Sequence, residues 1–204
     1  ILGYSIFLDD RWRSGGTSNG LTVFADGKNY TTKFLVDVVN KTGLEPHLFK
    51  APEIALQYAD RILSSSTSPV VISIRASAFE SARNASEDFI YELAQELSGA
   101  GHDVFIVPDQ ETGSFGNYKD LPAKILQEAA VNLPLRLALH EKASVSICSS
   151  GGPMILTSLA VSKPSFVVIN PLVPSVKVAS AEFLSWQGYR VGNEQPFSWT
   201  PTNQ

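Results

Sequence analysis

The segment SICSSGGPMILTSLA, from residue 146 to residue 160, contains residue types that suit the binding of an anion. Its centre holds two hydroxyls, two glycines and a proline: Ser149, Ser150, Gly151, Gly152 and Pro153. Glycines let a backbone approach a ligand closely, and hydroxyl and N–H donors before a helix suit phosphate oxygens. The segment therefore predicts a phosphate-binding turn, with a plain connection between a strand and a helix as the alternative.

Polar residues that follow other predicted strands supply the rest of the candidate site. Arg75 ends one strand, Arg83 and Asn84 lie in the loop after it, and Asp109 follows the next strand. Arginine offers a forked set of donors that matches phosphate oxygens. Because open parallel sheets bind ligands at the carboxyl ends of their strands, we expect these residues to share one edge with the 149–153 turn. Taken singly, they also fit an ion-paired arginine, a helix cap at Asn84 and a polar loop at Asp109.

Sequence patterns for several other chemistries are absent. Neither the dinucleotide-binding pattern Gly-x-Gly-x-x-Gly nor the phosphate loop that ends in Gly-Lys-Ser/Thr occurs. The three histidines are too far apart in sequence to show a metal-ligand spacing, so we predict no metal site. Asp9 and Asp10 could coordinate a metal, but two acids at the end of a strand are more typical of a turn.

Four residues that precede the candidate turn receive structural interpretations. His140 lies inside an apolar helix and is expected to be a packed residue rather than a base. Arg136 and Glu141, on the same helix, could be a surface pair. Cys148 ends an apolar strand and is expected in the core, because the sequence places no histidine partner beside it.

The composition is that of an ordinary globular protein, with 44% hydrophobic and 18% charged residues among 204. The net charge of −4 and the lack of a basic face argue against nucleic acid as a partner. No apolar run approaches the roughly 20 residues of a membrane span. The single cysteine excludes an internal disulfide and favours a reducing compartment, so we expect a cytoplasmic protein. We expect both ends to continue into a longer chain.

The order of predicted elements indicates the fold class. Apolar, β-branched runs predict strands at 69–75, 103–108, 144–148 and 165–170. Helices are predicted from the cap Asn84 to Gly99, and at 121–130, 133–142 and 153–162, with Asp120 and Asn132 as further caps. Before them, strands are expected at 4–8 and 21–25 and helices at 31–43 and 52–65. The alternation predicts an α/β fold with a doubly wound, mainly parallel, Rossmann-like sheet.

Two stretches of the sequence carry a resemblance to a known family. ISIRASAFESARNAS, followed by FIYELAQELSGAGHDVFIVPD, resembles the opening of the donor-binding, C-terminal half of heptosyltransferase-like glycosyltransferases of the GT-B fold. NLPLRLALHEKASVSICSSGGPMILTSLAVSKPSFVVIN resembles the units that follow, where a Gly-Pro turn precedes a helix. The resemblance covers about residues 69 to 171, roughly half the chain.

The resemblance implies a nucleotide-diphosphate sugar as the substrate, with no cofactor, and transfer of the sugar to a sugar or glycan acceptor. The diphosphate is expected near the 149–153 turn and the base near residues 107–109, and arginines with a helix start stabilise the leaving group without a metal. Residues 1–68 then form an N-terminal α/β segment, the remnant of a preceding half, and 69–204 the nucleotide-sugar-binding domain. Residues 1–68 are too short for the acceptor half, which usually supplies the catalytic base. Either that half lies outside this chain, or this domain works alone or as part of a larger polypeptide.

Two other functions stay open on the sequence alone. The first is a non-catalytic module that binds a nucleotide or sugar phosphate within a larger protein. The second is a different α/β enzyme, epimerase-like, in which Asp109, Glu111 or Glu141 transfers a proton. The sequence identifies no catalytic residue for transfer.

Overall fold

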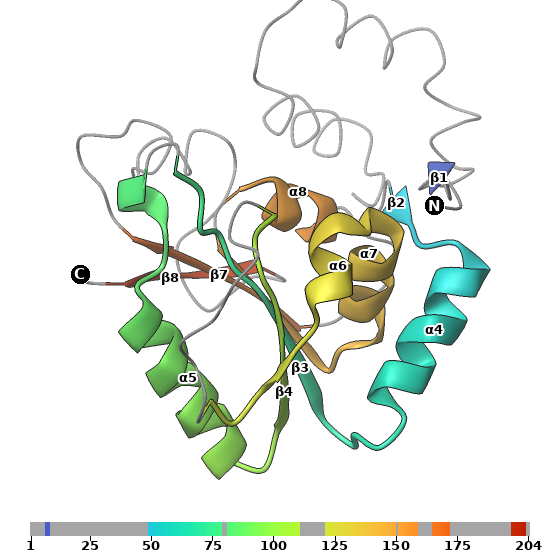
Figure 1. Cartoon of the computed structure of the whole chain (residues 1–204), viewed down its shortest axis with the longest axis horizontal. Helices are drawn as coiled ribbons and strands as arrows, with labels where there is room; N and C mark the ends of the chain where they lie inside the picture. Colours follow the sequence, from blue (N-terminus) through green and yellow to red (C-terminus); the bar gives the residue numbers. More distant parts are fainter. Residues whose placement is uncertain are drawn as a thin grey trace, which may run out of the picture.

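A computed structural model describes residues 7–8, 49–78, 81–110, 121–149, 151–158, 165–171 and 197–202 (Figure 1). Its centre is a parallel sheet with the strand order β5-β4-β3-β6-β7-β8. The strands are β3 (Pro69–Ser73), β4 (Asp103–Val107), β5 (Lys124–Ile125), β6 (Val145–Ser149), β7 (Ser165–Pro171) and β8 (Phe197–Thr202). A separate antiparallel pair joins β1 (Phe7–Leu8) to β2 (Phe49–Lys50). The α/β, Rossmann-like fold predicted from the sequence is confirmed.

The strand order changes direction at the centre of the sheet. From β3 the chain moves outward through β4 to β5, and then returns to place β6 on the other side of β3. Ile72 of β3 is therefore paired with Ile106 of β4 on one side and with Ile147 of β6 on the other. Open α/β sheets bind ligands outside the carboxyl ends of the strands at such a switch point. The fold thus directs attention to the ends of β3 and β6.

One face of the sheet is covered by α5 (Glu87–Gly99), which connects β3 to β4 (Figure 1). Side chains alternate between the two faces of a strand, so Val70 and Ile72 of β3 point to the same side. There they pack with Ile90 and Ala94, the two fully buried residues of α5. This apolar layer holds the β3–α5–β4 unit together.

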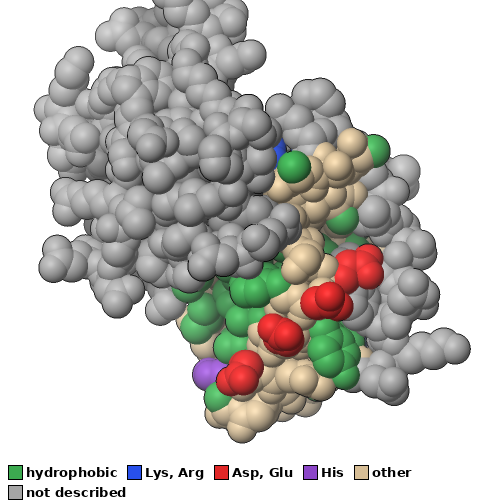
Figure 2. All heavy atoms as spheres, turned by 90° about the vertical axis from the view of Figure 1, so that its left-hand side faces the viewer, with side chains coloured by type: hydrophobic (Ala, Val, Ile, Leu, Met, Phe, Trp, Pro, Cys, Tyr) green, Lys and Arg blue, Asp and Glu red, His purple; other side chains and the backbone are tan. Residues whose placement is uncertain are grey.

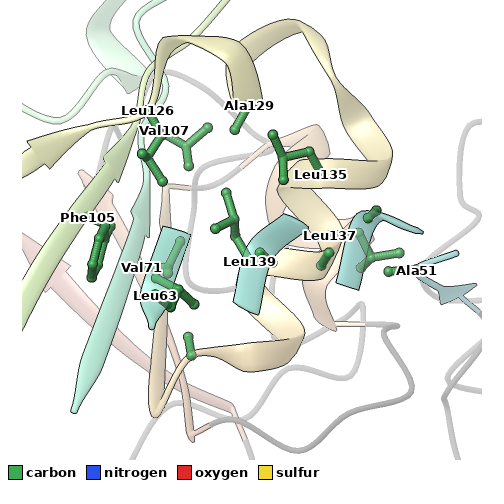
Figure 3. Close-up of a cluster of buried hydrophobic side chains, with 14 of the residues drawn as sticks. Ala51, Leu63, Val71, Phe105, Val107, Leu126, Ala129, Leu135, Leu137 and Leu139 are labelled. Atoms are coloured by element: carbon green, nitrogen blue, oxygen red, sulfur yellow. The ribbon is translucent and has the colours of Figure 1, made fainter. Parts of the chain in front are cut away.

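The opposite face is covered by α4 (Glu53–Leu63) and α7 (Leu133–Lys142), and Val71 of β3 points toward them (Figure 3). Every side chain from residue 135 to residue 140 of α7 is buried. The reason is that α7 lies between the sheet and α4 and contacts both. A helix in this position has no outer face for its polar residues, so they must find partners inside the protein.

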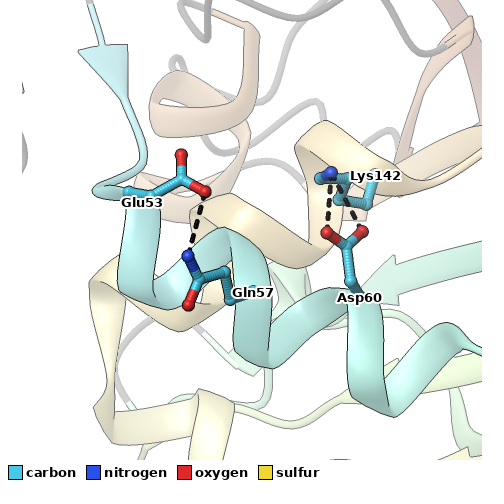
Figure 4. A network of polar contacts seen from close by, with 4 residues as sticks. All are labelled: Glu53, Gln57, Asp60 and Lys142. Carbon is cyan, nitrogen blue, oxygen red and sulfur yellow. Dashed lines mark hydrogen bonds and ion pairs between the residues drawn. The ribbon is translucent and has the colours of Figure 1, made fainter.

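The exposed side of α4 carries polar contacts at its surface (Figure 4). Gln57 Nε2 donates to Glu53 Oε1 at 3.2 Å, one helical turn apart. Lys142 Nζ, at the end of α7, lies 2.9 Å from Asp60 Oδ1 and 3.0 Å from Oδ2. Exposed pairs of this kind contribute at most about 1 kcal/mol each, so the buried side chains hold the two helices together.

The outer face of α5 carries a row of acidic side chains (Figure 2). Glu87 and Asp88 lie in the first turn, followed by Glu92 and Glu96, and all four are exposed. Acids in the first turn interact favourably with the positive end of the helix dipole. Glu92 and Glu96, four residues apart, repel each other, and the last turn of α5 holds no basic residue. The charge of this helix is therefore favourable at its start and unfavourable at its end.

The predicted helix at 121–130 is wrong in its first half. Lys124–Ile125 forms the short strand β5, parallel to β4, and Leu126 N donates to Ile106 O at 2.8 Å. The helix itself, α6 (Gln127–Val131), begins only after that. Pairing with the open edge of β4 satisfies backbone groups that a helix would otherwise have used.

The caps of the next helices are partly as predicted. Asn132 caps α7, because its Oδ1 accepts from Leu135 N at 3.1 Å, as expected from the sequence. The predicted cap of α5 is wrong: Ser86 holds that position, and its Oγ accepts from Phe89 N at 3.2 Å. Asn84 is committed to other partners, described below.

Several sequence predictions fall outside the described residues. They include the strand at 21–25, the helix at 31–43 and the cap Asp120, while 4–8 is described only at its end, as β1. The helix predicted at 153–162 is described as α8 (Gly152–Ser158). The division into 1–68 and 69–204 stays a prediction. The sequence did not predict β8, which extends the sheet beside β7. Among the described helices, none is long and apolar enough to cross a membrane.

Candidate functional site

The carboxyl ends of β3, β4 and β6 meet at one edge of the sheet, on the upper side in Figure 1. Residues 75–77 follow β3, Asp109 follows β4, and Ser149 ends β6 before residues 151–153. We call this group of residues the rim. It contains most of the candidate residues from the sequence, whereas Ser150 and Glu111 lie outside the described part of the chain.

Arg75 and Gly151 join the two sides of the switch point. A Cβ atom built on Gly151 would lie 3.8 Å from Arg75 Cδ and 3.8 Å from Pro153 Cδ. The Arg75 side chain, from the end of β3, therefore lies against the turn that follows β6. This places a guanidinium group and a glycine-containing turn side by side at the position where such folds bind ligands.

Asn84 holds the loop after β3. Its Oδ1 accepts hydrogen bonds from Arg75 Nη1 and, at 3.2 Å, from Ser77 N, while its Nδ2 donates to Ser77 O at 3.0 Å. Asn84 is thus a clamp on this loop and not the helix cap that the sequence suggested. Arg83, beside it, lies in the short 3₁₀ helix η1 (Ser81–Arg83), which contacts β7.

Asp109 connects two strand ends through its side chain. Its Oδ2 accepts a hydrogen bond of 3.0 Å from Ala76 N. A carboxylate after β4 therefore fixes the backbone of the residue that follows Arg75. The polar loop considered from the sequence is in fact a cross-link between neighbouring loops.

Ser149 has a buried hydroxyl that lacks a partner in the described structure. The residue is 2% exposed, and its Oγ makes no hydrogen bond. A hydroxyl buried in this way costs free energy, and most buried hydroxyls are paired. Ser149 lies at the end of β6 in the same turn as Gly151, so an unused hydrogen-bonding group is present at the rim.

Gly152 is exposed at the start of α8, and a Cβ atom built on it would meet no atom within 4 Å. Neither Gly151 nor Gly152 has a positive φ, unlike Gly101 in the turn after α5. The backbone conformation of the turn therefore does not demand glycine. Pro153 occupies the second position of α8, where its fixed φ suits a helix start.

A buried polar cluster that the sequence did not predict lies directly below the end of β3. Fully buried His140 of α7 contacts Ser73 Oγ through Nε2 at 2.8 Å and Ser146 Oγ through Nδ1 at 3.0 Å. Burial, with a smaller contribution from Arg136, lowers the pKa of His140 to about 3. His140 is therefore neutral at physiological pH and a packed residue, as expected.

The expectation that Cys148 has no histidine nearby is wrong. Its Sγ lies 3.9 Å from His140 Nε2 and 3.8 Å from Thr157 Oγ1 of α8. The contact arises because α7 packs on the sheet beside β6. The separation of the two residues in the sequence does not reveal this packing. Burial raises the pKa of the Cys148 thiol to about 12, so this cysteine is a core residue and not a nucleophile.

The predicted surface pair of Arg136 and Glu141 is also wrong. Arg136 is 4% exposed and donates to backbone carbonyls, one of which is Pro108 O at 2.8 Å. Glu141 Oε1 accepts from Ala51 N at 2.8 Å, which places this carboxylate between α7 and the start of α4. One signal was available in the sequence: Arg136 stands in LPLRLALH, where no polar face exists for a surface arginine.

The described residues contain no group of three or more His, Cys, Asp or Glu side chains that could hold a metal ion. Asp9 and Asp10 lie outside them.

Comparison with known proteins adds information on the fold. No protein-family model and no curated protein sequence matches this chain. Among solved structures, the chain is similar to the ADP-heptose LPS heptosyltransferase II of E. coli, with 14% sequence identity and a TM-score of 0.52. The similarity covers 77% of this chain and 45% of that protein, so the chain spans less than half the length of its structural neighbour. At this identity the likeness establishes a fold shared with one part of a heptosyltransferase.

Proposed function

We propose that this chain is the donor-binding half of a glycosyltransferase-like protein, which binds a nucleotide-diphosphate sugar at the rim. The fold it shares with a heptosyltransferase supports this proposal, as does the strand order with its switch point between β3 and β6. Transfer to a sugar or glycan acceptor would then require an acceptor half that this domain does not supply.

The observation that carries the proposal is the Ser149 hydroxyl, which has no partner in the described part of the chain, in the turn where the Arg75 side chain lies next to Gly151. A diphosphate against this turn would receive a charged donor from Arg75 and a hydroxyl donor from Ser149. The missing side chain at Gly152 leaves space for the ligand to approach the backbone. The nucleoside base would lie toward residues 107–109 at the end of β4.

The same groups suit the chemistry of transfer. When the bond between the sugar and the diphosphate breaks, negative charge increases on the leaving phosphate oxygens. A donor that is fixed in place before the reaction stabilises this charge without reorganisation. Asn84 fixes Arg75 in this way, because its Oδ1 accepts from the guanidinium.

The alternative of proton transfer receives no support from Glu141, whose carboxylate accepts a hydrogen bond from Ala51 N, just before α4. Asp109 already accepts a hydrogen bond from Ala76 N, and its geometry suits a structural cross-link. A non-catalytic binding module would use the same rim. The full-length protein distinguishes that module from a transferase, because only the transferase releases nucleoside diphosphate from a nucleotide sugar when an acceptor is added.

Calorimetric titration with ADP, UDP, GDP and CDP, and with the matching nucleosides, tests the proposed site. Arg75→Ala should weaken diphosphate binding by about ten- to a hundredfold, the worth of a charge-assisted hydrogen bond, and should leave nucleoside binding unchanged. Arg61→Ala is the matched control, because exposed Arg61 lies in the last turn of α4, near the amino ends of the strands (Figure 1). It should change neither affinity.

Gly152→Ala provides a second variant that leaves the fold intact. Its methyl group enters open space, and alanine suits a helix better than glycine, so the melting temperature should stay equal or rise. Diphosphate affinity should fall because the backbone becomes less accessible. The proposal would be overturned if the wild type bound no nucleoside diphosphate. It would also be overturned if the Arg75 and Arg61 variants lost diphosphate affinity to the same degree.

A further inference from the structure

Arg136 is a buried cation that the proposed function does not use. Its Nε donates to Ala129 O at 3.1 Å, and its Nη2 donates to Pro108 O at 2.8 Å and to Ala130 O at 3.2 Å. Burial lowers the pKa of Arg136, so the protein bears a cost to keep this group charged inside. An apolar side chain of similar length would pack in the same space without that cost.

The carbonyls that Arg136 binds belong to two different segments. Ala129 and Ala130 lie in α6, a helix so short that its last carbonyls have no partner within the helix. Pro108 follows the last residue of β4. One guanidinium group therefore ties α7 both to α6 and to the end of β4.

A chain of contacts leads from Arg136 to the candidate phosphate site. Pro108 is followed by Asp109, whose carboxylate accepts from Ala76 N and is also attracted by the Arg136 charge. Ala76 in turn follows Arg75, which lies against Gly151. Each step up to Arg75 is a hydrogen bond or a peptide bond, and the Arg75 side chain lies next to Gly151, where an added Cβ atom would be 3.8 Å from Arg75 Cδ.

We infer that Arg136 is a positioning residue for the donor site: by holding Pro108 it fixes Asp109, and through Asp109 it sets the loop that carries Arg75. The inference rests on the proposed function for its ligand. It requires the forked geometry of arginine, because the single nitrogen of a lysine cannot bind carbonyls of both segments with the same arrangement.

Nucleoside diphosphate binding to the full chain, measured by calorimetry, tests this role. Arg136→Met should weaken the binding at least tenfold, and Arg136→Lys, which keeps the charge, should weaken it to a similar degree. Ile90→Ala, on the opposite face of the sheet, is the control for lost stability, and should lower the melting temperature with unchanged affinity. Wild-type affinity in Arg136→Lys would overturn the inference, since charge alone would then suffice.

A double-variant comparison tests whether Arg136 acts through Asp109. The variant with both Arg136→Met and Asp109→Asn should bind no more weakly than the worse of the two single variants. If the loss of binding free energy in the double variant equals the sum of the losses in the two single variants, Arg136 does not act through Asp109.

The exchange rates of backbone amides, measured by NMR on the protein without ligand, test the inference even if no nucleotide binds. Arg136→Met should speed the exchange of the Ala76 amide at least tenfold, because its acceptor Asp109 is no longer held. The Ile90 amide, bonded to Ser86 O on the other face, should exchange as in the wild type. Unchanged protection at Ala76, or an equal loss at both amides, would refute the positioning role whatever the protein binds.

Discussion

Ser73 on β3 and His140 on α7 are joined by a hydrogen bond of 2.8 Å between Ser73 Oγ and His140 Nε2. The histidine is fully buried, and its other ring nitrogen contacts Ser146 Oγ on β6. One imidazole thus connects the two strands on either side of the switch point to the helix that covers them. Because the ring is fully buried and both nitrogens have partners, a second proton would place a charge in the interior and reverse the direction of one of these hydrogen bonds.

His140 should make the protein less stable in mild acid. The unfolded chain binds a proton at this residue below about pH 6.5, whereas the folded protein does so only near pH 3. Between these values the unfolded state holds more protons, so the free energy of unfolding falls by up to about 1.4 kcal/mol per pH unit as the pH decreases. Urea unfolding at pH 7.5, 6.5, 5.8 and 5.0 measures this dependence.

The variant His140→Gln serves as the control for that measurement. It should be less stable at pH 7.5, because the buried contacts are disturbed, yet should lose less stability between pH 6.5 and pH 5.0. Equal pH dependence in the variant and the wild type would show that another group titrates.

Ser149 and Ser146 should respond in opposite ways to the loss of their hydroxyls. Ser149→Ala removes an unpaired buried group, so the free energy of unfolding should rise by up to about 1 kcal/mol, while affinity for nucleoside diphosphates falls by about 1.5–3 kcal/mol. Ser146→Ala, on the same strand, leaves His140 Nδ1 without its partner and should lower stability with unchanged affinity. Chemical unfolding and calorimetric titration of both variants give the four values, and a loss of stability in Ser149→Ala would contradict the assignment.

The acidic row on α5 predicts a stability change that depends on position. Glu96→Lys replaces a repulsion with Glu92 by an attraction and places a cation near the negative end of the helix, so stability should rise by about 0.5–1 kcal/mol. Glu87→Lys makes the same change of charge in the first turn and should lower stability. The difference in melting temperature should shrink when salt rises from 20 mM to about 500 mM, because screening weakens both effects. Equal shifts in both variants would mean that net charge, and not the helix dipole, dominates.

Four strands of the central sheet, β3, β4, β6 and β7, could be predicted because each is a short β-branched run with clear ends, such as PVVIS before Ile74. The shared edge of Arg75, Asp109 and Ser149 then followed from parallel topology alone. The start of α6 could not be predicted. The residues before it have the pattern of a capped helix with a proline in its first turn. Lys124–Ile125 forms a strand because it pairs with the edge of β4, which the local sequence does not show.

The interior polar groups were beyond the reach of sequence patterns for a different reason. His140 is buried because it packs against β3 and β6, and Arg136 is buried against the carbonyls of α6 and Pro108. Spacing along the chain reveals neither of these contacts. The proximity of Cys148 to His140 depends on the packing of α7 against the sheet. The cap of α5 shows a local ambiguity, since Asn84 and Ser86 are both good caps and a contact with Ser77 decides between them.

The strand order also determines when the rim can form as the chain folds. Val70 is paired with Val104, from which one helix, α5, separates it in the sequence. It is also paired with Val145, from which β4, β5 and α7 separate it as well. Contacts between distant segments form late, since the entropy of closing the intervening loop must be overcome first. The β3–α5–β4 unit can therefore assemble early, while the seam between β3 and β6 closes near the end. Arg75 and Gly151 come together at that seam, so a chain folded only as far as the β3–α5–β4 unit would contain the apolar layer between α5 and the sheet and still lack the site.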